Sequence, residues 1–454
     1  MKNKLKVYSW MLYDWACQPI HTLIATFIFG PYFVQAVAEN PVEGQALIGM
    51  AVTVSGIVVA IFSPILGALA DQTQKRKPWI LLFSVFFVIS TFSLWYAEPN
   101  LENTFWVLFA YTVGFIAADF STVFTNAMMP SLEKPDKLGK LSGAGWGLGY
   151  LGGLVSLVIM LGLFVEQENG VTLLGSNPAL GLDAANREGT RVVGPLTAFW
   201  YVLFMIPFFV FVPDVKMTTP TQLNVKKAIK HLFLNIVNLR NQPSLGWFLV
   251  ASMFYRDAMN GIFFFGGIYA AGVLEMSTVQ LGIFGILAAA TGTIGAYWGG
   301  TLDSKYGSKF CVSIMLGGLL IVTLVIFGLS RSEFYGLPLD PNSNTPDIIF
   351  YIAGGLLGFV SGPIQSASRT LLIFLVDEKQ ITETFGLYAL VGRATAFLAP
   401  ALITWFTLAS GSQQIGLVPI IILLFIGWYL LRFVNVKNFC LLYTSPSPRD
   451  SYGS

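Results

Sequence analysis

Charged side chains are rare in the long apolar stretches of this sequence, and those that occur there are the first candidates for chemistry. Three are acidic and three are basic, namely Asp14, Asp119, Arg256, Asp257, Arg369 and Arg393. His21 lies in similar surroundings. Because a charge inside a bilayer is costly unless it faces protein or water, such residues typically mark pathways for ions, protons or polar solutes.

Two of these positions carry a second polar residue at helical spacing. Asp14 and His21 are seven residues apart, about two turns, so a helix places them on one face. The pair could carry a proton, or Asp14 could pair with a cation from another helix while His21 only forms a hydrogen bond. Asp119, with Asn126 two turns later, could contact a solute or proton, or hold one of the arginines.

The other candidates lie in the second half of the chain. Arg256 and Asp257 are adjacent, so on a helix their side chains diverge by about 100° and cannot face one spot. We expect one of them to face the interior and the other to hold a neighbouring helix. Arg369, with Gln365 one turn before it, could bind a carboxylate or form a salt bridge in a gate. For Arg393 we favour a structural role.

The elements that position these residues are predicted to be membrane-spanning helices. Hydrophobic residues make up 55% of the chain and charged residues only 11%, against about 25% charged residues in soluble proteins. The mean hydropathy is +0.68. Apolar runs of about 20 or more residues have the length that a helix needs to cross a bilayer. We predict an all-α membrane protein with twelve spans, near residues 10–37, 45–70, 78–97, 104–128, 141–165, 195–213, 245–272, 277–300, 310–329, 347–374, 385–409 and 415–434.

The spans divide into two halves of six. We predict an N-terminal six-helix bundle at residues 1–213, a polar linker along the membrane surface at 214–244, and a C-terminal bundle at 245–439. Residues 440–454, which begin Cys-Leu-Leu-Tyr-Thr-Ser, look like the translation of a sequencing adapter. We therefore exclude 440–454 from the fold prediction.

An internal repeat supports two related, pseudo-symmetric halves. A Gly-x-x-x-Asp pattern at residues 67–71, followed by three basic residues, recurs at 299–303, and both copies end the second span of their half. Glycines 143 and 149 in the fifth span likewise recur as glycines 386 and 392 in the eleventh. Internal repeats of this kind are typical of transporters with a site between the halves. Small residues at a four-residue interval allow close helix packing, which we expect at Gly145, Gly149 and Gly153.

The distribution of basic residues predicts the orientation in the membrane. Nineteen Lys and Arg residues lie at the N-terminus, in the linker and in the loops of that side, against three on the opposite side. Positive charge accumulates on the cytoplasmic side, so we expect both termini and the linker there. For a chain of this kind we expect the bacterial cytoplasmic (inner) membrane.

These motifs resemble the major facilitator superfamily over Trp10 to about Val434. Within it, Tyr13 to Ala16, the glycine-rich stretch Leu141 to Gly153, and Gly362 to Arg369 are similar to the branch of the autophagy-related vacuolar amino-acid effluxers and their bacterial relatives. The resemblance implies two six-helix bundles whose first, fourth, seventh and tenth helices line a central pathway. Asp14, Asp119, Asp257 and Arg369 fall on those helices, so the charge pattern agrees with the fold that the motifs indicate.

The resemblance also assigns a role to the repeated aspartates. Asp71 and Asp303 each end a helix, where the helix dipole disfavours a carboxylate unless a cation or another helix N-terminus compensates. In the superfamily such loops latch the halves together at the cytoplasmic side. We therefore expect Asp71 with Arg76, and more weakly Asp303, to form a gate latch.

Together these features predict a secondary transporter, or permease, that moves a small polar solute by alternating access, with an amino acid as the candidate substrate. We expect no cofactor, no metal and no nucleic-acid partner, and a monomer in the lipid bilayer. Whether protons are coupled to transport is left open by the sequence. A non-transporting membrane sensor or scaffold is the alternative, and an ion channel or a membrane-embedded enzyme fits less well, because neither a filter sequence nor a catalytic motif is recognisable.

Overall fold

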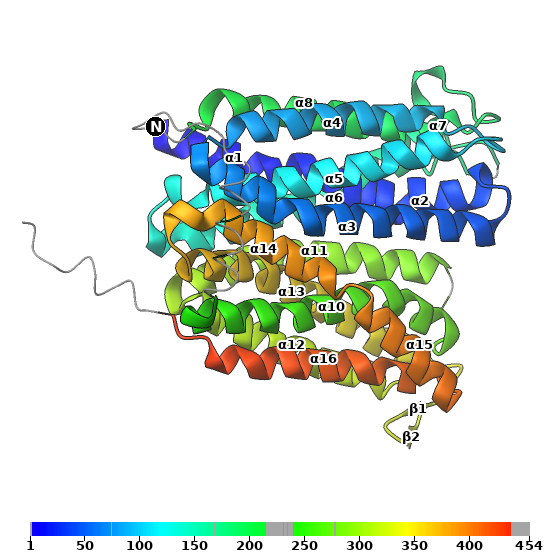
Figure 1. The fold of residues 1–454 in the computed structure, drawn as a ribbon. Coiled ribbons are helices and arrows are strands. Elements are labelled where there is room, and N and C mark those ends of the chain that lie inside the picture. The colour runs from blue at the N-terminus through cyan, green and yellow to red at the C-terminus, as the bar shows by residue number, and fades with distance from the viewer. Residues whose placement is uncertain are drawn as a thin grey trace, which may run out of the picture.

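The chain folds into long, roughly parallel helices, as the prediction of an all-α membrane protein requires (Figure 1). The computed structural model describes residues 2–73, 75–167, 169–214, 230, 234, 239–276 and 278–436. Within them, 11 helical stretches are long and apolar enough to cross a bilayer. The 30-residue helix α10 (Pro243–Gly272) brings the number of crossings to twelve. Most of the predicted linker, and the whole of 440–454, lie outside the described residues.

The first six crossings form one bundle, drawn in blue to green in Figure 1. They consist of α1 (Lys2–Pro19) with its continuation η1 (Ile20–Phe27), α2 (Phe29–Tyr32) and η2 (Phe33–Val37), then α3 (Pro41–Thr73), α4 (Lys77–Ser93), α5 (Phe105–Ala127), α6 (Leu138–Ile159) and α7 with α8 (Glu188–Arg191, Val193–Phe211).

The second bundle contains α10 and the helices that follow it. They are α11 (Thr278–Tyr306), α12 (Ser308–Phe327), α13 (Thr345–Phe374), α14 (Ile381–Ala394), α15 (Leu398–Ser410) and α16 (Val418–Leu430). A short hairpin, β1 (Glu333–Phe334) with β2 (Leu337–Pro338), follows α12. The prediction of two six-helix bundles is thereby confirmed.

Large apolar side chains cover the outer faces of the bundles. They are exposed on α4, α8, α12 and α16, the third, sixth, ninth and twelfth crossings, at positions such as Leu82, Phe86, Phe199, Ile206, Ile314, Ile321, Ile422 and Phe425. Exposed apolar surface on this scale suits contact with lipid chains rather than water. These crossings carry no charged residue in their middle parts, so the charged groups are left to the inner helices.

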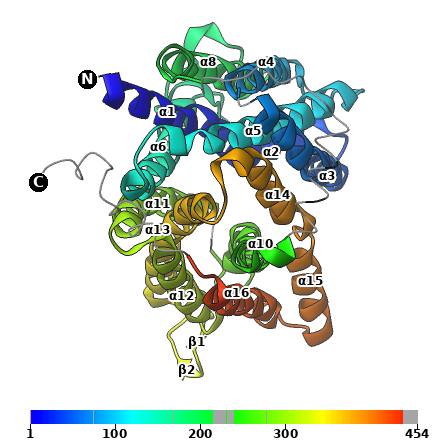
Figure 2. The ribbon, with the colours of Figure 1, turned by 60° about the vertical axis from the view of Figure 1, so that its left-hand side comes forward.

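The two bundles touch most closely where glycines remove side chains from both surfaces. A Cβ added at Gly143 of α6 would lie 2.6 Å from the Cα of Gly300 in α11, and one added at Gly386 of α14 would lie 2.6 Å from the Cα of Pro64 in α3. The sequence echo between Gly143 and Gly386 therefore corresponds to two matching contacts between the halves. Figure 2 shows α14 beside α3 and α5 of the other bundle.

The eleventh crossing is broken, where the sequence predicted one helix over 385–409. α14 ends at Ala394 and α15 begins at Leu398. Pro400 explains the position of the break, because a proline ring clashes with the carbonyl four residues earlier, here that of Ala396. A break inside a membrane is tolerated where other groups satisfy the freed backbone. The backbone N–H of Ala399 donates to Asp257 Oδ2 at 2.8 Å.

Pro19 has a similar effect in the first crossing. The regular α-helix ends at Pro19, and wider π-helical turns follow over Ile20–Phe27. A proline has no N–H for the carbonyl four residues before it, which is that of Trp15. This carbonyl accepts instead from the indole Nε1 of Trp200 at 3.1 Å. The bend is therefore stabilised by packing of α1 against α8.

Candidate functional site between the two bundles

A buried ion pair joins the first and tenth crossings. Both Nη atoms of Arg369 in α13 donate to Asp14 Oδ2 in α1, each at 3.2 Å. Nη1 also donates to Asn126 Oδ1 at 3.0 Å. Nε and Nη2 donate to the hydroxyl and the carbonyl of Ser142, at 2.8 and 2.7 Å. All five N–H groups of this guanidinium thus have acceptors, all from the other bundle.

The surroundings of Arg369 fix its position further. The rings of Trp10 and Trp146 lie 5.3 and 5.2 Å from the guanidinium carbon, within the range of cation–π attraction. Arg369 is only 3% exposed and Asp14 12%. Four crossings of the molecule, α1, α5, α6 and α13, therefore meet at one charged centre.

Helix α1 is held in register by bonds to α5. The indole of Trp10 donates to the Thr125 carbonyl at 2.9 Å, and the hydroxyl of Tyr13 contacts Thr122 Oγ1 at 3.0 Å. These bonds come directly before Asp14 in the chain and so fix the carboxylate.

The predicted glycine ladder provides the space for α1 on the α6 side. A Cβ at Gly145 would lie 2.7 Å from Asp14 Oδ2, and one at Gly149 would lie 3.4 Å from Asp14 Cβ. At Gly153 a Cβ would lie 2.8 Å from Gln18 Cγ. The ladder therefore packs mainly against the first crossing of the same bundle, and a Cβ at Gly145 would also lie 3.4 Å from Nη2 of Arg369 in the other bundle.

A second ion pair crosses between the bundles, between Arg393 of α14 and Asp119 of α5. Their side chains are 33% and 21% exposed, so this pair is more accessible than that of Arg369. His21 of the first crossing is exposed nearby. Its ring lies edge-on to Phe115, with 5.9 Å between centroids. Arg393, for which the sequence favoured a structural role, therefore forms an ion pair between the two bundles.

One end of the molecule carries a further contact between the bundles. We call it the linker end, because Asp214, where the linker begins, accepts from the backbone N–H groups of Arg76 and Lys77 there, at 3.0 and 3.2 Å. Asp71 at the end of α3 pairs with Arg76 at 3.4 Å. Its two oxygens also accept from the backbone N–H groups of Thr382 and Glu383, at 3.2 and 2.8 Å.

Both forms of compensation predicted for Asp71 are thus present, a cation and a helix N-terminus, since α14 begins at Ile381. Asp303 lies at the matching place between α11 and the start of α6, where a Cβ at Gly139 would be 2.6 Å from its carboxyl carbon. Asp303 accepts from Ser308 Oγ at 2.6 Å, and no cation is bonded to it among the described residues. The second copy of the motif therefore makes the weaker electrostatic contact.

Two predicted pathway residues hold the second bundle together instead. Arg256 donates to the Tyr388 carbonyl at 2.7 Å and lies 4.2 Å from the centroid of that ring. Asp257, 1% exposed, accepts from Ala399. The side chains of Arg256 and Asp257 thus diverge, as predicted for adjacent helical residues. Both contact the eleventh crossing, one on each side of its break. The side chain of Gln365 lies near Tyr150 of the other bundle.

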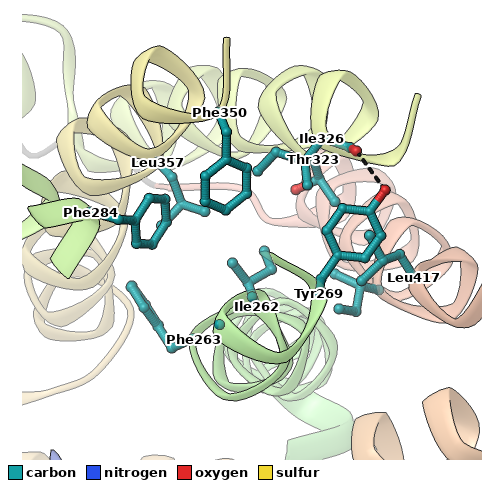
Figure 3. Close-up of a pocket in the computed structure, with 12 residues that line it drawn as sticks. Ile262, Phe263, Tyr269, Phe284, Thr323, Ile326, Phe350, Leu357 and Leu417 are labelled. Atoms are coloured by element: carbon teal, nitrogen blue, oxygen red, sulfur yellow. Dashed lines mark hydrogen bonds between the residues drawn. The ribbon is translucent and has the colours of Figure 1, made fainter. Parts of the chain in front are cut away.

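A cavity of about 60 Å³ in the second bundle is separate from the charged centre, and residues of α10, α11, α12, α13 and α16 line it. Figure 3 shows aromatic and aliphatic side chains turned toward it. Its most polar lining group, the hydroxyl of Tyr269, donates to the carbonyls of Ile326 and Leu329 at 3.2 and 2.7 Å. No lining residue is charged, so this cavity does not suit a polar solute.

Solved structures with this arrangement of helices are membrane transporters. The human organic anion transporter MFSD10 (TETRAN) has a TM-score of 0.69 with 14% identity, over 94% of this chain and 99% of that one. The E. coli fucose:proton symporter FucP has a TM-score of 0.68 with 13% identity, over 96% and 98%. The chain therefore has the major facilitator fold.

Relatives in sequence agree with the fold. The Bacillus subtilis (strain 168) protein described as "Uncharacterized MFS-type transporter YxiO" is 25% identical over 94% of both chains. This chain is thus an integral membrane transporter of the major facilitator class, not an enzyme. It belongs to the family described as "Vacuole effluxer Atg22 like", which matches residues 37–439. Autophagy-related protein 22-1 of Neosartorya fischeri is 23% identical over 66% of this chain, which covers about half, 48%, of that protein.

Proposed function

We propose that the chain is a secondary active transporter for a zwitterionic solute of amino-acid size, working by alternating access. The observation that carries this proposal is that both interior ion pairs, Asp14 with Arg369 and Asp119 with Arg393, join an acid of one bundle to an arginine of the other. If the bundles rock apart, both pairs must separate. The proposed cycle therefore exchanges charge partners between the bundles.

The charge balance supports the substrate class. Three acidic and three basic residues lie inside the spans, so the interior favours neither sign. A zwitterion carries both charges and can satisfy one group of each sign. The resemblance to vacuolar amino-acid effluxers supports the same class.

We further propose the location and orientation. The excess of Lys and Arg at the linker end supports a cytoplasmic position for that end and for both termini. The Bacillus relative supports the bacterial cytoplasmic membrane. The proposed domain boundaries remain 1–213, 214–244 and 245–439, in a monomer.

The linker-end contacts are proposed as the cytoplasmic gate. Asp71 with Arg76 would latch α3 to α14, and Asp303 would support α11 against α6. Asp14, Asn126 and Arg369 would close the pathway one layer deeper. When these contacts are intact, the solute can enter only from the side opposite the linker end. We therefore interpret the conformation of this structure as closed at the linker end.

Proton coupling is proposed for the more accessible layer. His21 is exposed beside Asp119, and an imidazole is the side chain whose charge changes most readily near neutral pH. Protonation of this pair would weaken the attraction of Asp119 for Arg393. Coupled proton movement would then accompany each turnover.

The test is transport by purified protein in liposomes. Labelled amino acids are offered in a counterflow assay with and without an imposed pH gradient, to wild type and to Asp14→Asn and Asp119→Asn. Saturable uptake of one of them, lost in the variants, is expected. Uptake of no zwitterion would refute the substrate class. A rate indifferent to the gradient and to both variants would refute proton coupling.

A further inference from the structure

The two ion pairs between the bundles differ in how many of their hydrogen-bonding groups are already in use. Arg369 has an acceptor for each of its five N–H groups. Arg393 donates one hydrogen bond among the described residues, to Asp119 Oδ2. Four N–H groups of Arg393 and the second oxygen of Asp119 therefore remain open to another molecule.

Exposure separates the pairs in the same direction. Arg393 and Asp119 are 33% and 21% exposed, whereas Arg369 is 3% exposed. A partly exposed pair attracts weakly, since water competes with both partners, so its replacement by a ligand costs little. A buried pair leaves an uncompensated charge when one partner is lost. The buried pair of Arg369 therefore suits a contact that holds the two bundles together. The more exposed pair of Arg393 suits a contact that a ligand can replace.

We infer that Asp119 and Arg393 bind the two charged ends of the solute, with the ammonium group on the Asp119 carboxylate and the carboxylate on the Arg393 guanidinium. This assignment rests on the proposed function, because it specifies where a zwitterion binds. The solute enters between the two side chains and replaces their direct bond by two charge-assisted bonds. A guanidinium with free N–H groups can take a carboxylate in a two-point contact.

The placement of the two residues gives the bound solute a mechanical effect. Asp119 belongs to α5 in the first bundle and Arg393 to α14 in the second. A solute held by both side chains therefore connects the bundles and stabilises conformations in which they stay close. A solute with one charge binds one bundle only and has no such effect.

Arg393 also stands directly before the break of the eleventh crossing. α14 ends at Ala394, and α15 is held by the bond from Ala399 to Asp257 of α10. On its C-terminal side, Arg393 is thus followed by a break in the helix, and the helix after the break is held in place by Asp257. Arg393 can therefore move toward a ligand without disrupting helical hydrogen bonds beyond Ala394.

The test compares each zwitterion with two derivatives that lack one charge. L-leucine, L-glutamine and L-arginine are each paired with their methyl ester, which has no α-carboxylate, and their N-acetyl form, which has no α-ammonium. Apparent Kd is measured on the purified full chain from ligand-induced thermal stabilisation. Wild type is expected to bind at least one parent amino acid at least about tenfold more tightly than both derivatives, as expected for loss of one charged hydrogen bond.

Two variants then assign the ends of the solute. Arg393→Gln is expected to raise the apparent Kd of the parent amino acid by about tenfold or more, while the Kd of the methyl ester changes by less than about twofold. Asp119→Asn is expected to raise the Kd of the parent amino acid similarly, while the Kd of the N-acetyl form changes by less than about twofold. The double variant Asp119→Asn with Arg393→Gln leaves no unpaired charge, so it provides a folded protein that lacks both ends of the site.

The control is an ion pair of the same chemistry away from the bundle contact. Arg331 donates a hydrogen bond to Asp347 at 2.7 Å within the second bundle. Arg331→Gln is expected to leave unchanged the ratio of the apparent Kd of each derivative to that of its parent amino acid. If wild type prefers a zwitterion but Arg393→Gln, Asp119→Asn and the double variant keep its preference, the assignment is wrong and the proposed function stands. If wild type binds no zwitterion, both are wrong.

Discussion

Replacing Arg369 by glutamine removes the side chain that ties the bundles together most extensively. It deletes the bonds to Asp14, Asn126 and Ser142 and leaves the Asp14 carboxylate, 12% exposed, without a cation. Loss of one partner from a buried ion pair costs about 3–5 kcal/mol. Because Arg369 and Asp14 lie on different bundles, this cost falls on the conformation closed at the linker end. The closed form should lose roughly 10²- to 10⁴-fold in population relative to forms open there.

The shift can be measured as a distance between the bundles. Lys75 and Lys379 are exposed at the linker end on opposite bundles, so each can be replaced by cysteine and spin-labelled in an otherwise cysteine-free background. Double electron–electron resonance should give one short distance for wild type. Arg369→Gln should add or substitute a longer one.

Two further variants decide the cause of the shift. Asp14→Asn combined with Arg369→Gln removes both charges and should restore part of the short distance, since no unpaired carboxylate remains. Arg256→Gln removes an arginine bonded within the second bundle and should leave the distance unchanged. An unaltered distance in Arg369→Gln would show that this residue does not lock the linker end.

Three other changes follow from the same contacts. Asp71→Ala, which removes the acceptor of two N–H groups at the start of α14, should lengthen the distance between the labels more than Asp303→Ala does, because Asp303 bonds to no cation among the described residues. Gly143→Val should also lengthen it, since a Cβ there meets the backbone of α11. Asp257→Ala should lower the apparent Tm in detergent, at a cost of about 1–3 kcal/mol, while Asp257→Asn, which keeps an acceptor, should lower it less.

Much of the fold could be predicted because the bilayer imposes strong rules on sequence. Apolar runs gave the crossings, and the repeat of residues 67–71 at 299–303 gave the two halves. The pairing of Asp14 and of Asp119 with an arginine was an expected alternative, because an interior charge needs a partner. Which arginine pairs with which acid could not be predicted, since this depends on how two bundles dock.

The break in the eleventh crossing could not be predicted from the pattern of apolar residues. Pro400 lies at the break, but the apolar run around it continues without interruption. The structure stabilises the break through Asp257, far away in the chain, which accepts the N–H of Ala399. The pairing of Arg393 with Asp119 likewise depends on packing between segments far apart in the chain. Its exposure and its unused N–H groups are defined only by the packed structure.

We propose that the charges between the bundles change partners during transport. An experimental structure of the protein with its linker end open is the measurement that tests this proposal. Asp14 and Arg369 should then be separated beyond hydrogen-bonding reach, while Arg256 still contacts Tyr388 and Asp257 still accepts from Ala399. An open linker end with the Arg369 bonds to Asp14 and Ser142 intact would show that these charges do not change partners.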